Sequence, residues 1–288
     1  MGAFGETESV RAALADAVRA RDAAALALVP AVACGVFLLP PATRRRLAFA
    51  YDDPTAVTAY TNHVVHFGVE HLAANVLGFA LLAGSGYVLA ALAGHRRLFG
   101  AAAATYLVAF PPVLSALNLV VGDDALGYGL SGVNMAFEGL LGLVVVAYAR
   151  QRLDGRVRVR HAPAVFFAAT AAVAVLALPP GRWAAGIAAA SAVVAAGYVA
   201  SARSAWRDAT PSPAGGRAES LLAQTGWLDV GVLAGVVFAG YLAVGFPAPV
   251  GGDGVVVNLY VHLLGFSLGF SVPYVALELG AFEASGGE

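Results

Sequence analysis

Five polar side chains of the types used in nucleophilic and acid–base chemistry lie in three separate segments of this apolar chain. They are His66, His71 and Asn75 in the first segment, Ser131 in the second and His262 in the third. A serine hydroxyl becomes a strong nucleophile when a base takes its proton, and a histidine with a pKa near about 6.5 suits that role at neutral pH. Asparagine, histidine and backbone N–H groups can donate hydrogen bonds to the resulting oxyanion. Together these residue types indicate acyl-transfer chemistry.

Glycines accompany both the serine and the last histidine. Gly129 and Gly132 flank Ser131, and glycine gives the backbone unusual dihedral angles or a close approach to another chain. The segment is not the G-x-S-x-G elbow of soluble hydrolases, because Val133 stands where that pattern needs glycine. Positions 262, 265 and 269 share one helical face, so Gly265 and Gly269 predict a groove beneath His262 where another helix packs closely.

The composition identifies the class of protein that must position these residues. Apolar residues make up 59% of the 288 residues and charged residues 12%, with a mean hydropathy of +0.76. Soluble domains have about 25% charged residues. We therefore predict an all-α polytopic membrane protein, which contacts the lipid bilayer and has no features of nucleic-acid binding.

Apolar runs long enough to cross a bilayer occur about eight times. The first contains Pro30 and continues to Leu39, past the only signal-peptide-like cleavage site, so we expect a retained helix. Cys34 is the only cysteine, which excludes an internal disulfide and a cysteine-based metal cluster. The predicted spans are 24–40, 69–93, 98–120, 129–149, 163–179, 183–202, 227–247 and 255–279.

Arginine placement predicts the orientation in the membrane, because cytoplasmic segments are enriched in positive charge. All 17 basic residues are arginine, and a cytoplasmic N-terminus places 13 of them inside. The four outside are Arg182 and the run Arg44, Arg45 and Arg46 in the long connection 41–65. We expect both termini in the cytoplasm of a multi-pass cell-membrane protein.

In this orientation three helices that carry polar residues enter the membrane from the non-cytoplasmic side. His71 and Asn75 lie one turn apart at the start of the second span, and Ser131 and His262 lie near the starts of the fourth and eighth. These four side chains should therefore lie at similar depth, toward the outer face.

In their order and spacing the three segments resemble the rhomboid family of intramembrane serine proteases. The motifs are H-x-x-x-x-H-x-x-x-N from His66 to Asn75, G-x-S-G from Gly129 to Gly132, and H-x-x-G-x-x-x-G from His262 to Gly269. The resemblance implies that Ser131 is the nucleophile and His262 its general base. It also implies that His71, Asn75 and the Ser131 N–H line the oxyanion hole, and that His66 lies toward the water-access side.

The resemblance also implies a fold. A rhomboid-like six-helix core would cover residues 24–149 and 227–280, with a helical hairpin at 163–202 inserted between the serine and histidine helices. The two added spans return the chain to the same side of the membrane, so the helix that carries His262 still enters from the non-cytoplasmic side. We expect one membrane domain over 23–282, a cytoplasmic lead at 1–22, a flexible linker at 203–221 and a short tail at 283–288.

Besides the added hairpin, the chain departs from the family pattern in the connection before the second span and at Met135. The connection before the second span lacks the family's Trp-Arg pair over residues 56–65. Met135 stands where an aromatic residue often packs on the catalytic histidine, although a methionine can also contact a ring. Glu138 lies on the face of Ser131, about 10 Å deeper, and should be protonated or hydrogen-bonded, with Asn134 a possible partner.

The function that follows is an intramembrane serine endopeptidase that cleaves peptide bonds in or near transmembrane segments of membrane proteins. A serine–histidine dyad needs no metal or organic cofactor, and metal binding by His63, His66 and His71 is a weak alternative. Two other classes stay open: a catalytically inactive rhomboid-like protein that binds membrane clients, and a small-solute transporter. The transporter is the weaker alternative, because the chain shows no internal repeat and its polar residues gather near one face.

Overall fold

The computed structural model describes residues 9–120, 126–207, 226–247 and 258–282. This part of the chain is helical apart from two strands of two residues each, β1 (Phe49–Ala50) and β2 (Leu126–Gly127). The strands pair antiparallel, with Phe49 opposite Gly127 and Ala50 opposite Leu126. The predicted linker at 203–221 lies mostly outside the described residues, and the predicted tail lies wholly outside them.

Seven described helices are long and apolar enough to cross a membrane, which agrees with the prediction of a polytopic helical membrane protein. A short helix, α1 (Val10–Ala17), precedes them. The first two spanning helices are α2 (Ala20–Phe37) and α5 (Val69–Leu92), and α8 (Ser131–Tyr148) continues through a π-helical turn, η2 (Ala149–Leu153). The remaining spans are α9 (Pro163–Ala177), α10 (Arg182–Arg207), α12 (Trp227–Gly245) and α13 (Leu259–Glu278). A 3-10 turn, η3 (Val159–His161), precedes α9.

The predicted third span is not one straight helix. It consists of α6 (Arg96–Val108) and α7 (Phe110–Asn118), which are bent by 48° relative to each other. Pro111 and Pro112 explain the break, because proline lacks the N–H that continues a helix and fits its first turn instead. With this bent pair counted as one span, the described chain has eight candidate spans.

The predicted start of the first span is wrong, and the connection that follows this span is ordered. The first span begins at Ala20 rather than at residue 24, because Arg21 and Asp22 lie in its first turn as helix formers instead of ending it. The connection 41–65 contains α3 (Pro41–Leu47), β1, α4 (Ala56–Thr61) and a 3-10 turn, η1 (Asn62–Val64). Pairing with β2, far along the chain, gives this connection order that the local sequence does not reveal.

Arg44, one of the four arginines opposed to the charge bias, is buried in this connection. Its Nη1 donates to the carbonyl oxygen of His66 at 2.7 Å and its Nε to that of Leu39 at 3.1 Å. The guanidinium also lies 4.7 Å from the centroid of the Phe37 ring. Arg44 therefore links backbone groups at the two ends of this connection. Its position reflects this packing role rather than the membrane orientation.

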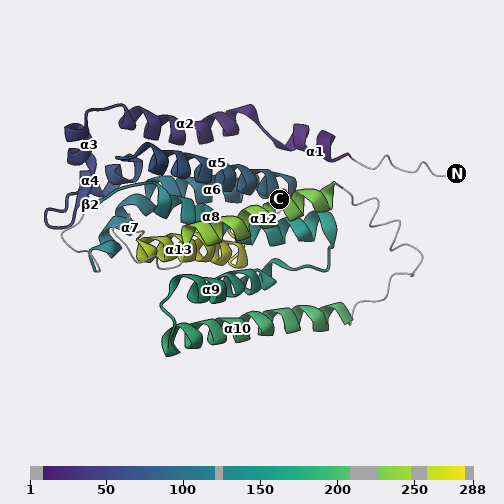
Figure 1. Cartoon of the computed structure of the whole chain (residues 1–288). Helices are drawn as coiled ribbons and strands as arrows, with labels where there is room; N and C mark the ends of the chain where they lie inside the picture. The colour runs from purple at the N-terminus through teal and green to yellow at the C-terminus, as the bar shows by residue number, and fades with distance from the viewer. Residues whose placement is uncertain (1–8, 121–125, 208–225, 248–257, 283–288) are drawn as a thin grey trace.

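The helix α8 lies at the centre of the bundle, between α5, α12 and α13 (Figure 1). Within its apolar window 83% of the residues are buried, against 17% for α10 at the edge of the molecule. A residue that begins α8 is thus held by neighbours on several sides.

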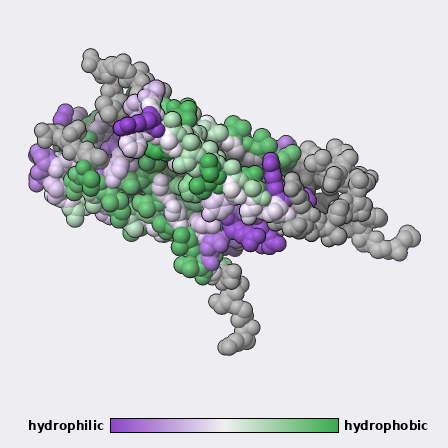
Figure 2. Space-filling model, turned by 90° about the horizontal axis from the view of Figure 1, so that it is seen from below, coloured by the Kyte–Doolittle hydropathy of each residue, from purple (hydrophilic) through white to green (hydrophobic). Residues whose placement is uncertain are grey.

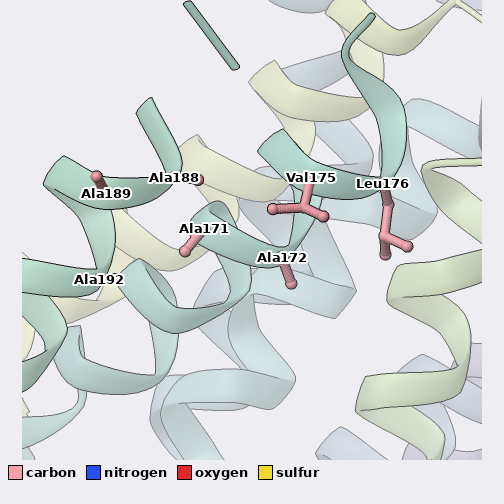
Figure 3. A pocket seen from close by; sticks show the side chains of 7 residues that line it. All are labelled: Ala171, Ala172, Val175, Leu176, Ala188, Ala189 and Ala192. Carbon is pink, nitrogen blue, oxygen red and sulfur yellow. The ribbon is translucent and has the colours of Figure 1, made fainter. Parts of the chain in front are cut away.

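The hairpin of α9 and α10 covers one side of this bundle. Phe166 of α9 stacks on Phe266 and Phe270 of α13, with ring centroids 5.3 Å and 4.8 Å apart. Figure 2 shows the surface on this side, with hydrophobic residues over its middle and hydrophilic residues toward its two ends. A hollow of about 580 Å³ between α9 and α10 is lined only by apolar side chains (Figure 3). It offers no group for acid–base or nucleophilic chemistry.

Candidate active site

Ser131 is the first residue of α8, and the segment before it is fixed by two sets of backbone hydrogen bonds. β2 pairs with β1, and the N–H of Gly129 donates to the carbonyl oxygen of Asn62 at 2.9 Å. Gly129 has a φ of +107°, in the region that favours glycine. The turn into α8 therefore needs glycine at this position for its conformation.

Gly129 is also the point where the first two motifs meet. A Cβ atom on Gly129 would lie 2.9 Å from Cε1 and 3.1 Å from Nε2 of His71, and 3.9 Å from Nε2 of His66. The rings of His66 and His71 are themselves 5.0 Å apart in an edge-to-face arrangement. Both histidines thus lie beside the backbone that leads to Ser131.

The third motif meets the second through direct contact of α13 with α8. A Cβ atom on Gly132 would lie 2.6 Å from Cγ1 of Val261, the residue before His262. Cβ atoms on Gly265 and Gly269 would collide with the backbone carbonyl oxygens of Gly132 and Ala136. The predicted glycine groove exists, and the helix that fills it is the serine helix itself.

His262 is buried, and its hydrogen bond fixes the tautomer of its neutral ring. Its Nδ1 lies 2.6 Å from the carbonyl oxygen of Gly245, which can only accept, so Nδ1 carries the proton. The lone pair is then on Nε2, the nitrogen that a general base would use. Among the described residues no hydrogen bond joins Ser131 Oγ to His262. Hydrogen bonds of catalytic pairs are often long without substrate and tighten when it binds.

The aromatic ring next to His262 comes from outside the serine helix. Phe246, at the end of α12, has its ring centroid 6.1 Å from that of His262 at an interplanar angle of 88°. Met135 is fully buried, and its Sδ would lie 2.7 Å from a Cβ on Gly245. Met135 therefore packs against the residue whose carbonyl oxygen holds the His262 ring.

Asn75 joins the site through a buried network. Its Nδ2 donates to the His71 carbonyl oxygen at 2.9 Å, which leaves its second amide hydrogen for another acceptor. Asn134 Nδ2 donates to the Asn75 carbonyl oxygen at 2.9 Å and lies 3.1 Å from the Tyr241 hydroxyl oxygen. Tyr241 was not predictable from the sequence, because it lies on α12 and meets α8 only in the tertiary fold.

The expected Asn134–Glu138 hydrogen bond is not formed. Asn134 turns toward α5 and α12 instead, and both Glu138 carboxyl oxygens are buried without a hydrogen-bond partner among the described residues. Tertiary partners have prevailed over the neighbour one turn away in the same helix.

A second network, which sequence reasoning missed, holds the start of α13. Asn258 Oδ1 accepts from the Val261 N–H at 3.0 Å and so caps the helix, and its Nδ2 donates to Asn118 Oδ1 at 3.0 Å. Asn118 Nδ2 in turn donates to the Tyr51 hydroxyl. An asparagine three residues before Val261 is a helix-cap signal that the sequence offered. The network ties the first turn of α13, which contains His262, to α7 and to the connection after β1.

Two histidines in the connection before α5 are neutral at neutral pH. Burial lowers the pKa of His63 to about 4, although its hydrogen bond to the Pro111 carbonyl oxygen at 3.0 Å favours the charged form. Burial, and then the proximity of His71, lower the pKa of His66 to about 4. Among the described residues no three His, Cys, Asp or Glu side chains converge as metal ligands would.

The residue types that the sequence analysis singled out lie at three neighbouring helix starts. Ser131 begins a helix whose first N–H groups have no intrahelical acceptor and whose dipole favours negative charge there. His262 lies in the adjoining helix α13, His71 lies beside Gly129 in the turn before Ser131, and the Asn75 carbonyl oxygen accepts from Asn134 in the first turn of α8. Comparison with protein families, with curated proteins and with solved structures finds no match to this chain.

Proposed function

We propose that this protein is an intramembrane serine endopeptidase of the rhomboid type. The observation that carries the proposal is the meeting of three helix starts, those of α5, α8 and α13. They bring together Ser131, a His262 ring oriented by Gly245, and the His71–Asn75 pair. Nucleophile, base and oxyanion donors in one polar cluster of an apolar bundle form the minimal set for peptide hydrolysis.

The arrangement of helices fits this proposal. In it, α2, α5, the bent α6–α7 pair, α8, α12 and α13 form a rhomboid-like six-helix core, and α9–α10 is an inserted hairpin. Both termini face the cytoplasm and the active site faces the non-cytoplasmic side. The substrates are transmembrane segments of other membrane proteins.

The proposed reaction begins on a substrate helix that has locally unwound, because helical carbonyl groups are engaged in hydrogen bonds. His262 Nε2 takes the proton of Ser131 Oγ as that oxygen attacks the peptide carbonyl carbon. The oxyanion accepts hydrogen bonds from the Ser131 N–H, Asn75 and His71. His262 then gives its proton to the leaving amine as the C–N bond breaks. Water, deprotonated by His262, hydrolyses the ester and the proton returns to Ser131.

One observation favours a second candidate. The missing hydrogen bond between Ser131 Oγ and His262 is also what a catalytically inactive rhomboid-like protein that binds membrane clients would show. The two candidates differ in the reactivity of Ser131, since a serine without a working base is a poor nucleophile.

Labelling with a fluorophosphonate tests this difference, because the reagent phosphonylates activated serines. We expect the purified protein in bilayers to be labelled at Ser131, as located by peptide mass spectrometry. Labelling should disappear in Ser131→Ala, fall strongly in His262→Ala and persist in Ser271→Ala, a control within α13. Absence of labelling in the folded parent protein would favour the client-binding candidate.

A further inference from the structure

At the end of the bundle opposite Ser131, we propose a binding site for the phosphate headgroup of an anionic phospholipid. A hollow of about 430 Å³ opens there, where the end of α8, the turn η3 and the end of α13 meet. Arg150, Arg158 and Arg160 line it together with His95, and Leu277 and Phe282 form part of its wall. The proposal concerns a surface remote from the candidate active site and does not depend on peptidase activity.

The three arginines differ from Arg152 and Arg156, which lie near them, in their contacts within the described part of the chain. Among the described residues, the guanidinium groups of Arg150, Arg158 and Arg160 form no ion pair and no hydrogen bond. Arg152, by contrast, donates to the Leu92 carbonyl oxygen at 2.9 Å, and Arg156 pairs with Asp154 at 2.6 Å. Guanidinium groups that converge on one hollow without a protein partner are suited to a phosphate, which they can bind through paired hydrogen bonds.

The charge of the hollow is positive. Glu278 is its one acidic lining residue, against three arginines, and it forms no ion pair with them within the described chain. Burial and the nearby Arg150 lower the pKa of His95, so this ring is neutral and can donate or accept a hydrogen bond. The hollow therefore complements a singly or doubly charged anion.

The apolar wall favours a lipid over a free anion. Leu277 and Phe282 are half-buried and border the same hollow as the arginines, so an apolar surface adjoins the charged one. A phospholipid offers a phosphate with glycerol and acyl groups directly beside it, and basic pockets on the cytoplasmic side of membrane proteins suit such headgroups. The arginine distribution places this end of the bundle on the cytoplasmic side, where anionic lipids are available.

Lipid retention measured by native mass spectrometry tests the site. The protein would be reconstituted with phosphatidylglycerol and phosphatidylcholine and then released into detergent. The site variant combines Arg150→Gln, Arg158→Gln and Arg160→Gln. Its matched control combines Arg11→Gln, Arg97→Gln and Arg203→Gln, which removes the same charge from exposed positions on the same side.

We expect the parent and control proteins to retain phosphatidylglycerol in preference to phosphatidylcholine. The site variant should bind it on the order of a hundredfold more weakly, at roughly a fivefold loss per arginine. Equal retention by the site variant and the control would overturn the proposal. Displacement of the lipid by millimolar inorganic phosphate would also overturn it, because the site would then be one for a free anion. Thermal melting of both variants checks that each is folded.

Discussion

At the residue scale, the histidine and asparagine side chains around Ser131 are held by backbone groups. Gly245 orients His262, and the carbonyl oxygen of His71 holds Asn75. The residue types and spacings in the sequence were enough to select these side chains, because buried polar groups are rare in an apolar chain. The carbonyl groups that orient them were not predictable, because any residue can supply a carbonyl and only the fold decides which one does.

Replacement of Asn75 by leucine tests the oxyanion role. Leucine has a similar volume and no hydrogen-bond donor, so we expect kcat to fall about 100-fold to 1000-fold with little change in KM. The measurement is steady-state cleavage of a fluorescent transmembrane substrate in bilayers. An unchanged kcat in a folded Asn75→Leu protein would remove Asn75 from the oxyanion hole.

At the element scale, hydropathy located the spans because each needs a long apolar run, but it did not locate the bends and pairings between them. The α6–α7 bend follows from Pro111, a local signal that hydropathy does not read, and the β1–β2 pair joins short segments far apart in the sequence. The glycine spacing did predict a close helix contact, and Gly139 of α8 extends it, since its Cβ would lie 2.6 Å from the backbone nitrogen of Phe270. The glycine spacing within one helix predicts that a groove exists. Which helix packs into that groove is known only from the tertiary structure.

Gly269→Ala tests this contact between α8 and α13. The new Cβ would meet backbone atoms of Ala136, which cannot move aside as a side chain can. Alanine in place of glycine usually stabilises a helix by roughly 1 kcal/mol. The steric clash should outweigh this gain, so we expect the free energy of unfolding to fall by about 2–3 kcal/mol. Gly84→Ala in α5 is the control, because a Cβ there meets no atom within 4 Å. Equal thermal stability of both variants would contradict the close packing.

The connection before α5 should lose stability in acid. His63 has a folded pKa of about 4, below the unfolded value of 6.5, so the unfolded chain binds more protons between these values. Above about pH 6.5 His63 is neutral in both states, so the free energy of unfolding keeps its full value. As the pH falls to about 4, protonation of His63 in the unfolded chain lowers the free energy of unfolding by on the order of 3 kcal/mol at most. Melting temperatures at pH 7 and pH 4.5 measure it.

The His63→Gln variant provides the comparison for this acid effect. Glutamine can still donate to the Pro111 carbonyl oxygen but does not titrate, so the variant should lose less stability than the parent over the same pH interval. Equal losses in the two proteins would show that other groups account for the acid sensitivity.

At the scale of the whole molecule, two ends of the bundle have different chemistry. Helix starts with histidine, serine and asparagine gather at one end, and three arginines that form no ion pair or hydrogen bond among the described residues gather at the other. Counting arginines predicts which end faces the cytoplasm, and Arg44, which opposes the count, is buried and donates to the His66 carbonyl oxygen. The stacking of Phe166 of α9 on Phe266 and Phe270 of α13 was not predictable from the sequence, because apolar side chains carry no signal that identifies their partner.

Cysteine accessibility tests the orientation. Cys34 is the only cysteine and would be replaced by alanine, after which single cysteines are introduced by Asp52→Cys and by Gly155→Cys at exposed positions in two connections. We expect a membrane-impermeant maleimide to label intact cells only through the Asp52→Cys variant, and the Gly155→Cys variant only after permeabilisation. The reverse pattern would invert the proposed topology.

The most direct test of the central claim is cleavage of a labelled transmembrane substrate by the purified protein in bilayers, with Ser131→Ala and His262→Ala compared at equal folded concentration. The account predicts that the parent cleaves a panel member near the outer end of its transmembrane segment and that both variants form no product above background. Cleavage that survives Ser131→Ala would contradict the assignment of the nucleophile, and a folded parent inactive on the whole panel would contradict the proposed peptidase.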